Sequence, residues 1–170
     1  LAALAAAVLA ALLALQQGGL APAGAAGVSY YVSTTGSDSN PGTQAAPFRT
    51  VQRAANAVSP GDVVNIAPGT YNEAVSITRS GSSGAPIVFR RDGAGEVWID
   101  SACSATNTVA ITGDYITLQD IGVRRAAEST ISLNGADFIT IERATVQDWN
   151  CSEGEDQYRA GIASWGGHEP

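Results

Sequence analysis

The sequence contains no lysine and no methionine, and charged residues make up only 15% of its 170 residues. All nine basic residues are therefore arginines, scattered along the chain, and the formal net charge at pH 7 is −7. This balance argues against a nucleic-acid partner, because phosphate binding requires a clustered basic face. Hydrophobic residues still reach 45%, so the chain can bury the core of one domain.

Long hydrophobic runs are also scarce, and one stands at the start of the chain. Residues 1–15 are apolar, and mostly small residues follow from Ala21 to Ala26. This run matches the apolar region of a secretory signal peptide and is shorter than the roughly 18 to 20 residues that a membrane-spanning helix needs. We therefore expect residues 1–27 to be an N-terminally incomplete signal peptide. The mature protein should be secreted and have no membrane segment.

The remaining apolar residues fall in runs that are too short for helices. Val63 to Ile66 and Val75 to Ile77 are each bounded by Pro-Gly or Gly-Thr-Tyr sequences, which is typical of short β-strands between turns. The 19 glycines and seven prolines also indicate a turn-rich chain. We therefore predict an all-β protein.

These short runs recur at a common spacing. The segment from Asp114 to Leu118 returns as Asp137 to Ile141, 23 residues later. Aliphatic pairs follow similar offsets in three rows: Val64/Ile66, Ile87/Phe89, Ile116/Leu118 and Ile139/Ile141; Val75/Ile77, Val97/Ile99, Ile121/Val123 and Ala144/Val146; and Val109/Ile111, Ile131/Leu133 and, after a longer step, Ile162. A coil with three short faces buries its apolar side only by stacking on another coil, so the pattern predicts a parallel β-helix with about 23 residues per coil.

Alternation within the rows supports this fold. The residues between the aliphatic pairs should face outward, and in the first row these are Asn65, Val88, Thr117 and Thr140. An ordinary β-sandwich is the alternative, although it has no reason to keep one spacing on several rows.

Residues 47–58 follow a helical spacing instead. Apolar side chains recur at positions 48, 51, 54, 55 and 58, just before Ser59-Pro60-Gly61. The first coil of a solenoid exposes a strand edge, so we expect an amphipathic helix to cap it. The predicted organisation is a signal peptide in 1–27, an N-terminal strand, loop and capping helix in 28–61, and the first coils in 62–170.

Several motifs in this N-terminal region resemble a known family. The segments YYVSTTGSDSNPGT, PFRTVQRAANAV, PGDVVNIAPGTY and GAPIVF are similar to the start of secreted right-handed parallel β-helix proteins, most closely the family 9 pectate lyases. The resemblance implies a right-handed coil and calcium-dependent β-elimination on an acidic polysaccharide. In that family the base is a lysine and calcium lies in an aspartate cluster on later coils.

This chain has neither feature. It contains no lysine, and we find no match to the aspartate cluster, so no catalytic residue is assigned. We expect the catalytic region to lie beyond residue 170 and the β-helix to be truncated at its C-terminal end.

Three functions are consistent with the sequence. The first is a polysaccharide lyase of the pectate lyase type, and the second is another β-helix carbohydrate enzyme, such as a uronan epimerase or a glycoside hydrolase. The third is a non-catalytic β-helix for surface adhesion or carbohydrate binding. The expected partner is a polysaccharide, acidic in the first case, and we expect the full-length protein to be a monomer.

Three residues are candidates for binding substrate. Trp98 stands between the inward-facing Val97 and Ile99, so its indole should face outward, where it could stack on a sugar ring or pack under a neighbouring turn. Arg91 and Arg124, each in an arginine pair, could bind uronate carboxylates or belong to the ordinary surface.

The longer step in the third row contains an acidic segment. Asp148, Glu153, Glu155 and Asp156 could bind calcium there or form a solvated loop.

The only cysteines are Cys103 and Cys151, and an exported protein favours a disulfide between them. They should lie two coils apart, about 10 Å at the spacing of neighbouring strands, which is longer than a disulfide spans. Two separate thiols are therefore the alternative.

Overall fold

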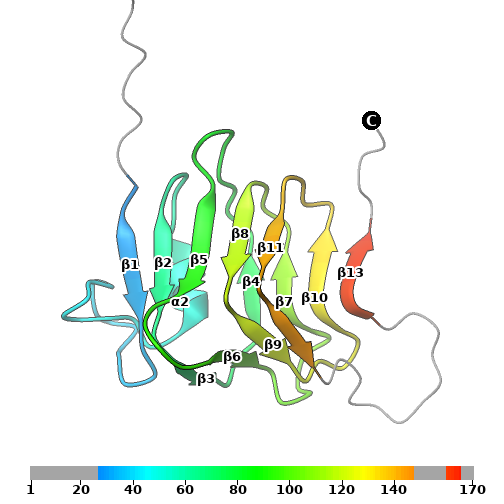
Figure 1. Cartoon of the computed structure of the whole chain (residues 1–170), viewed down its shortest axis with the longest axis horizontal. Helices are drawn as coiled ribbons and strands as arrows, with labels where there is room; N and C mark the ends of the chain where they lie inside the picture. The colour runs from blue at the N-terminus through cyan, green and yellow to red at the C-terminus, as the bar shows by residue number, and fades with distance from the viewer. Residues whose placement is uncertain (1–26, 148–159, 166–170) are drawn as a thin grey trace, which may run out of the picture.

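A computed structural model describes residues 27–147 and 160–165 of the chain. In this part there are one α-helix and thirteen β-strands, and every pairing between strands is parallel. The strands form three sheets. Successive strands along the chain belong to different sheets, so the chain winds as a solenoid whose coils stack side by side (Figure 1). The predicted parallel β-helix is confirmed.

The three sheets share the strands of each coil in turn. Sheet 1 contains β1 (Ser29–Val32), β2 (Val63–Ile66), β5 (Ile87–Arg91), β8 (Ile116–Gln119) and β11 (Thr140–Glu142). Sheet 2 contains β3 (Gly69–Tyr71), β6 (Val97–Asp100), β9 (Gly122–Arg124) and β12 (Thr145–Gln147). Sheet 3 contains β4 (Val75–Ile77), β7 (Asn107–Ile111), β10 (Ser129–Asn134) and β13 (Ala160–Trp165).

The core lies inside the solenoid and consists of like residues stacked on like. In sheet 1, Phe89 pairs with Val64 on one side and with Leu118 on the other, and all three side chains are buried. Burying each such side chain stabilises the fold by about 1.5–3 kcal/mol. The stacking explains why the sequence repeats aliphatic pairs at nearly constant offsets.

Most of the predicted strand register is confirmed. Leu118 pairs with Ile141, as the offset of 23 residues requires. The pairing of Val109 with Ile131 and that of Ile99 with Val123 also agree with the predicted rows.

Three predicted pairings are wrong. Val64 pairs with Phe89 and not with Ile87, and Leu133 pairs with Ser164 while Ile162 pairs with Ile131. Val75 and Ile77 belong to the third row, opposite Val109 and Ile111. The strand that opens the second row is Gly69–Tyr71, which has no aliphatic pair by which the sequence pattern could reveal it. Asn65 lies on the outer side as predicted but is buried, because the Arg90 side chain donates a hydrogen bond to it.

The predicted amphipathic helix is present as α2 (Val51–Ala57). The Thr50 hydroxyl caps it by accepting a hydrogen bond from the Arg53 amide at 3.1 Å. The helix packs against β1 and β4, and its buried residues are Val51, Ala54 and Ala55.

The helix also covers the free edge of β4, which is the first strand of sheet 3. The Gln52 side chain accepts a hydrogen bond from the Ser76 amide at 2.7 Å and donates one to the Ser76 carbonyl at 3.1 Å. A side-chain amide thus takes the place of a neighbouring strand, which protects the edge from pairing with another chain.

A sharp corner joins sheet 1 to sheet 2. In two successive coils it contains a residue in the left-handed conformation, Asp120 at φ 57 and Arg143 at φ 49. This conformation costs a residue with a side chain roughly 1–2 kcal/mol. The Asp120 amide donates to the Glu142 carbonyl of the next coil at 3.0 Å, so the strained corners stack in register. The candidate site lies on the outside of this corner.

The expected signal peptide lies almost entirely outside the described residues. Within residues 27–147 and 160–165, no helix is long and apolar enough to cross a membrane.

Candidate functional site

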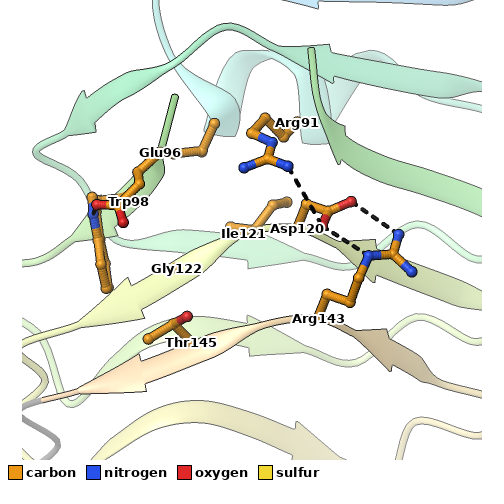
Figure 2. Close-up of a pocket in the computed structure, with 9 residues that line it drawn as sticks. Arg91, Glu96, Trp98, Asp120, Ile121, Gly122, Arg143 and Thr145 are labelled. Carbon is orange, nitrogen blue, oxygen red and sulfur yellow. Dashed lines mark hydrogen bonds and ion pairs between the residues drawn. The ribbon is translucent and has the colours of Figure 1, made fainter. Parts of the chain in front are cut away.

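A shallow cavity of about 110 Å³ lies on the outer surface where sheet 1 turns into sheet 2. Figure 2 shows Trp98 on one side of it and a group of charged side chains on the other. Its lining residues come from three successive coils: Arg91, Glu96, Val97, Trp98, Asp120, Ile121, Gly122, Arg143 and Thr145. The cavity therefore depends on the strand register, because residues far apart in sequence meet only when the coils stack.

The charged side of the cavity is a column of three residues, Arg91, Asp120 and Arg143. The pairing of Arg90 with Gln119 and of Gln119 with Glu142 puts these three residues at the same position of successive coils. Arg143 donates two hydrogen bonds to Asp120, from Nε to Oδ1 at 2.8 Å and from Nη2 to Oδ2 at 2.9 Å. The Arg143 hydrogen bonds hold the pKa of Asp120 below its usual value.

Arg91 is held less tightly than Arg143. Its Nη2 lies 3.7 Å from Asp120 Oδ1, which is an ion pair without a hydrogen bond. Its Nη1 donates to the Gly95 carbonyl at 3.0 Å, and the residue is exposed. The guanidinium therefore keeps donors that can reach a ligand.

Trp98 is fixed by its neighbours on three sides. Its Nε1 donates to Glu96 Oε2 at 2.9 Å, and the Arg124 guanidinium lies 4.8 Å from the centre of the ring, which is a cation–π contact. Gly122 is opposite Trp98 in the next coil, where a Cβ atom would lie 2.5 Å from ring atom Cε3. Only a glycine at position 122 leaves room for the indole in this orientation.

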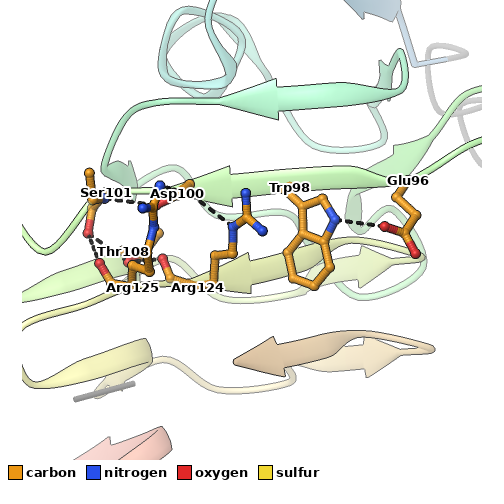
Figure 3. Close-up of polar contacts among 8 residues, drawn as sticks. Glu96, Trp98, Asp100, Ser101, Thr108, Arg124 and Arg125 are labelled. Carbon is orange, nitrogen blue, oxygen red and sulfur yellow. Dashed lines mark hydrogen bonds and ion pairs between the residues drawn. The ribbon is translucent and has the colours of Figure 1, made fainter. Parts of the chain in front are cut away.

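Arg124 is in turn fixed by Asp100, whose side chain is completely buried (Figure 3). Asp100 accepts hydrogen bonds from Arg124 Nε at 2.9 Å, Arg125 Nε at 2.7 Å and the Ala102 amide at 2.9 Å. Desolvation alone would raise the pKa of Asp100, but the hydrogen bonds from Arg125, Ala102 and Arg124 together lower it. The carboxylate stays charged and anchors the side chain that stacks on Trp98.

This arrangement is suited to binding. It offers an aromatic ring, arginine donors, and acceptor oxygens of Glu96 and Thr145 around one cavity. Asp120 is a poor general base, because its lowered pKa places it far from the neutral range in which proton abstraction is efficient.

The structure brings two of the three predicted substrate-binding residues, Arg91 and Trp98, to this cavity. The third, Arg124, stacks on Trp98. Sequence reasoning missed Asp120, Arg143 and Gly122. Asp120 and Arg143 could have been found from the repeat itself, because they lie 23 residues apart and share the position of Arg91 in their coils.

The other predicted sites are not tested by the structure. The acidic residues Asp148, Glu153, Glu155 and Asp156 lie outside the described residues. Among the residues that are described, no group of three histidine, cysteine, aspartate or glutamate side chains could hold a metal ion. They do not fit a calcium site.

Cys103 is disulfide-bonded, but Cys151, the only other cysteine of the sequence, lies outside the described residues. The pairing of Cys103 with Cys151 stays a prediction.

Three parallel sheets wound from short coils, with a helix at the first coil, define a parallel β-helix protein. Residues 30–157 match the family described as "Pel9A-like, right handed beta helix region". The chain belongs to this family of right-handed β-helix proteins.

Two curated relatives and two solved structures are similar to the chain. It is 34% identical over 116 residues to the uncharacterized protein YwoF of Bacillus subtilis (strain 168), covering 61% of this chain and 24% of that protein. It is 29% identical over 111 residues to pectate lyase L of Dickeya dadantii (strain 3937), covering 57% of this chain and 26% of that enzyme. The chain therefore spans about a quarter of the length of these relatives.

The crystal structure of pectate lyase Pel9A superimposes with a TM-score of 0.62 at 27% identity, covering 71% of this chain and 33% of that one. A rhamnogalacturonan lyase structure, with a TM-score of 0.56, 18% identity and coverage of 81% and 50%, shows the similarity of the fold alone.

Proposed function

We propose that the chain is the N-terminal part of a secreted polysaccharide lyase of the pectate lyase type, which cleaves an acidic polysaccharide by β-elimination. The match of residues 30–157 to the Pel9A-like family carries this proposal. The similarity to pectate lyase L and to the Pel9A structure supports the same reaction class.

The reaction removes the proton on the carbon next to the uronate carboxylate. The electrons of that C–H bond form a C=C bond, the glycosidic C–O bond on the next carbon breaks, and the departing oxygen takes up a proton. Such a reaction needs a base whose pKa is close to the working pH and a positive charge at the carboxylate.

The described coils do not supply this base. Asp100 and Asp120 are both held ionised by arginines that lower their pKa values, so neither takes up a proton readily. We therefore assign the base and any calcium ligands to residues outside the described ones. The described coils serve as a capped scaffold and contribute contacts to the saccharide.

Incubation of the full-length protein with polygalacturonate, with and without calcium, tests the proposal. We expect ultraviolet absorbance from unsaturated uronate ends that rises in parallel with the reducing ends. New reducing ends without that absorbance would contradict a lyase and indicate a hydrolase. Binding of the polymer with no new ends would indicate a non-catalytic module.

Secretion is tested separately. N-terminal sequencing of the protein recovered from the culture medium should give a mature start between Gly24 and Val28. An unprocessed protein inside the cells would contradict the expected signal peptide.

A further inference from the structure

We propose that the cavity between sheet 1 and sheet 2 binds one residue of an acidic saccharide, with the sugar ring against Trp98 and its carboxylate on Arg91. The choice of an acidic sugar rests on the function proposed above. The site itself rests on the geometry of the cavity.

The first argument is that the aromatic surface is preorganised. Arg124 lies on one side of the indole and Glu96 on the other (Figure 3), and the ring stands at the edge of the cavity (Figure 2). An indole face is apolar and flat, so the C–H groups of a sugar ring pack well against it. Because the ring is already fixed, binding costs little conformational entropy.

The second argument is the layer of residues that support Trp98. A buried carboxylate, Asp100, holds Arg124, and Gly122 leaves the space that the indole occupies. A tryptophan that merely covered a strand would need neither device. The structure thus commits a buried charge and a glycine to the position of one partly exposed aromatic ring.

The third argument is the charge of the column. Arg91, Asp120 and Arg143 together carry one excess positive charge, and the two hydrogen bonds of Asp120 come from Arg143. Arg91 contacts Asp120 only at 3.7 Å. Its planar guanidinium can therefore bind the carboxylate of a uronate, for which two parallel hydrogen bonds are the favoured geometry.

The cavity also has an acceptor for a sugar hydroxyl. Glu96 is exposed, and its Oε2 accepts the Trp98 hydrogen bond. The other oxygen can accept a hydroxyl, and this contact would hold the sugar close to the ring.

The location distinguishes this site from the predicted calcium segment. Residues 148–159 connect β12 to β13, that is, sheet 2 to sheet 3, whereas the cavity lies between sheet 1 and sheet 2. We therefore infer a holding site for the polysaccharide chain, separate from the chemistry.

The test uses the intact protein labelled with 5-fluorotryptophan and followed by ¹⁹F NMR. The sequence has three tryptophans, Trp98, Trp149 and Trp165, so each signal can be assigned with a Trp→Phe variant. Trigalacturonic acid is the probe and galactotriose its neutral counterpart, both titrated with a chelator present. We expect the Trp98 signal to shift with the acidic probe at a lower concentration than with the neutral one.

Two variants test the proposed contacts. Arg91→Gln should weaken the acidic probe about tenfold at the Trp98 signal while leaving the neutral probe unchanged, because it removes a charged hydrogen-bond partner. Arg90→Gln is the matched control, since it removes the same charge one residue away on the outer face of sheet 1, and should change neither probe.

The outcomes separate this inference from the proposed function. A Trp98 signal that does not move with either probe overturns the site even if the protein cleaves polygalacturonate. A Trp98 shift that Arg91→Gln leaves unaltered overturns the role of Arg91. A shifted signal without lyase activity keeps the site and contradicts only the proposed reaction.

Discussion

Two aspartates on neighbouring corners of the β-helix each face two arginines, but their surroundings differ. Asp100 is completely buried, with Arg124 and Arg125 against it. Asp120 lies at the surface, where Arg143 and Arg91 approach it unequally. The buried aspartate has satisfied partners on all sides and acts as a fixed support. The surface aspartate neutralises one arginine and leaves the other available, which is the arrangement that a ligand site needs.

Removing the buried charge should give the largest effect. Asp100→Asn keeps the size of the side chain but replaces one acceptor oxygen with an NH₂ group that faces arginine donors. We expect the free energy of unfolding to fall by about 3 kcal/mol, since a buried partner of charged groups is lost. Urea unfolding measures this loss. Asp92→Asn, at an exposed position, is the control and should leave the urea midpoint unchanged.

The pH dependence of stability should follow the same carboxylate. The pKa of Asp100 in the folded protein lies below its usual value of 3.8, so its stabilising effect is present above pH 3.8 and is lost as the pH falls through the lower folded value. The urea midpoint of the wild type should therefore drop on acidification below pH 3.8. A wild-type curve parallel to that of Asp100→Asn in this range would show that Asp100 does not carry the effect.

A smaller effect is expected where Asp100 acts through Arg124 on Trp98. Gly122→Ala adds a Cβ atom that would lie 2.5 Å from the indole, and such overpacking costs about 1–3 kcal/mol. The same substitution in a Trp98→Ala background should cost clearly less, because the ring is gone. A double-mutant cycle in urea measures this coupling. Equal costs in both backgrounds would mean that Gly122 is not required by Trp98.

The repeat of the sequence predicted the architecture well, but only where aliphatic pairs mark the strands. The coils from β5 onward keep their inward pairs, so the pairing of Leu118 with Ile141 follows from spacing alone. The first coil does not follow this rule. Its second strand, Gly69–Tyr71, contains glycine in place of an aliphatic residue, so Val75 and Ile77 were assigned to the wrong row.

The candidate site shows a similar limit. Alternation predicts that Trp98 faces outward, because Val97 and Ile99 face the core. What surrounds Trp98 depends on which residue of the next coil lies opposite, and that residue is Gly122. An error of two residues in register, as occurred for Val64, would put a different side chain there. Contacts across coils therefore require the three-dimensional register, whereas the facing of each residue does not.

The smallest expected effect concerns the surface aspartate. Asp120→Asn leaves the positive charges of Arg91 and Arg143 without the carboxylate that partly neutralises them. An acidic trisaccharide should then bind about threefold more tightly at the Trp98 signal, as expected for removal of one negative charge near a solvated site. The gain should shrink at high salt, because the Debye length falls. Glu128→Gln, at an exposed position on another part of the chain, removes the same charge and should not change binding. Weaker binding by Asp120→Asn would mean that Asp120 positions the arginines for the ligand, whereas tighter binding means that it competes with the ligand for Arg91.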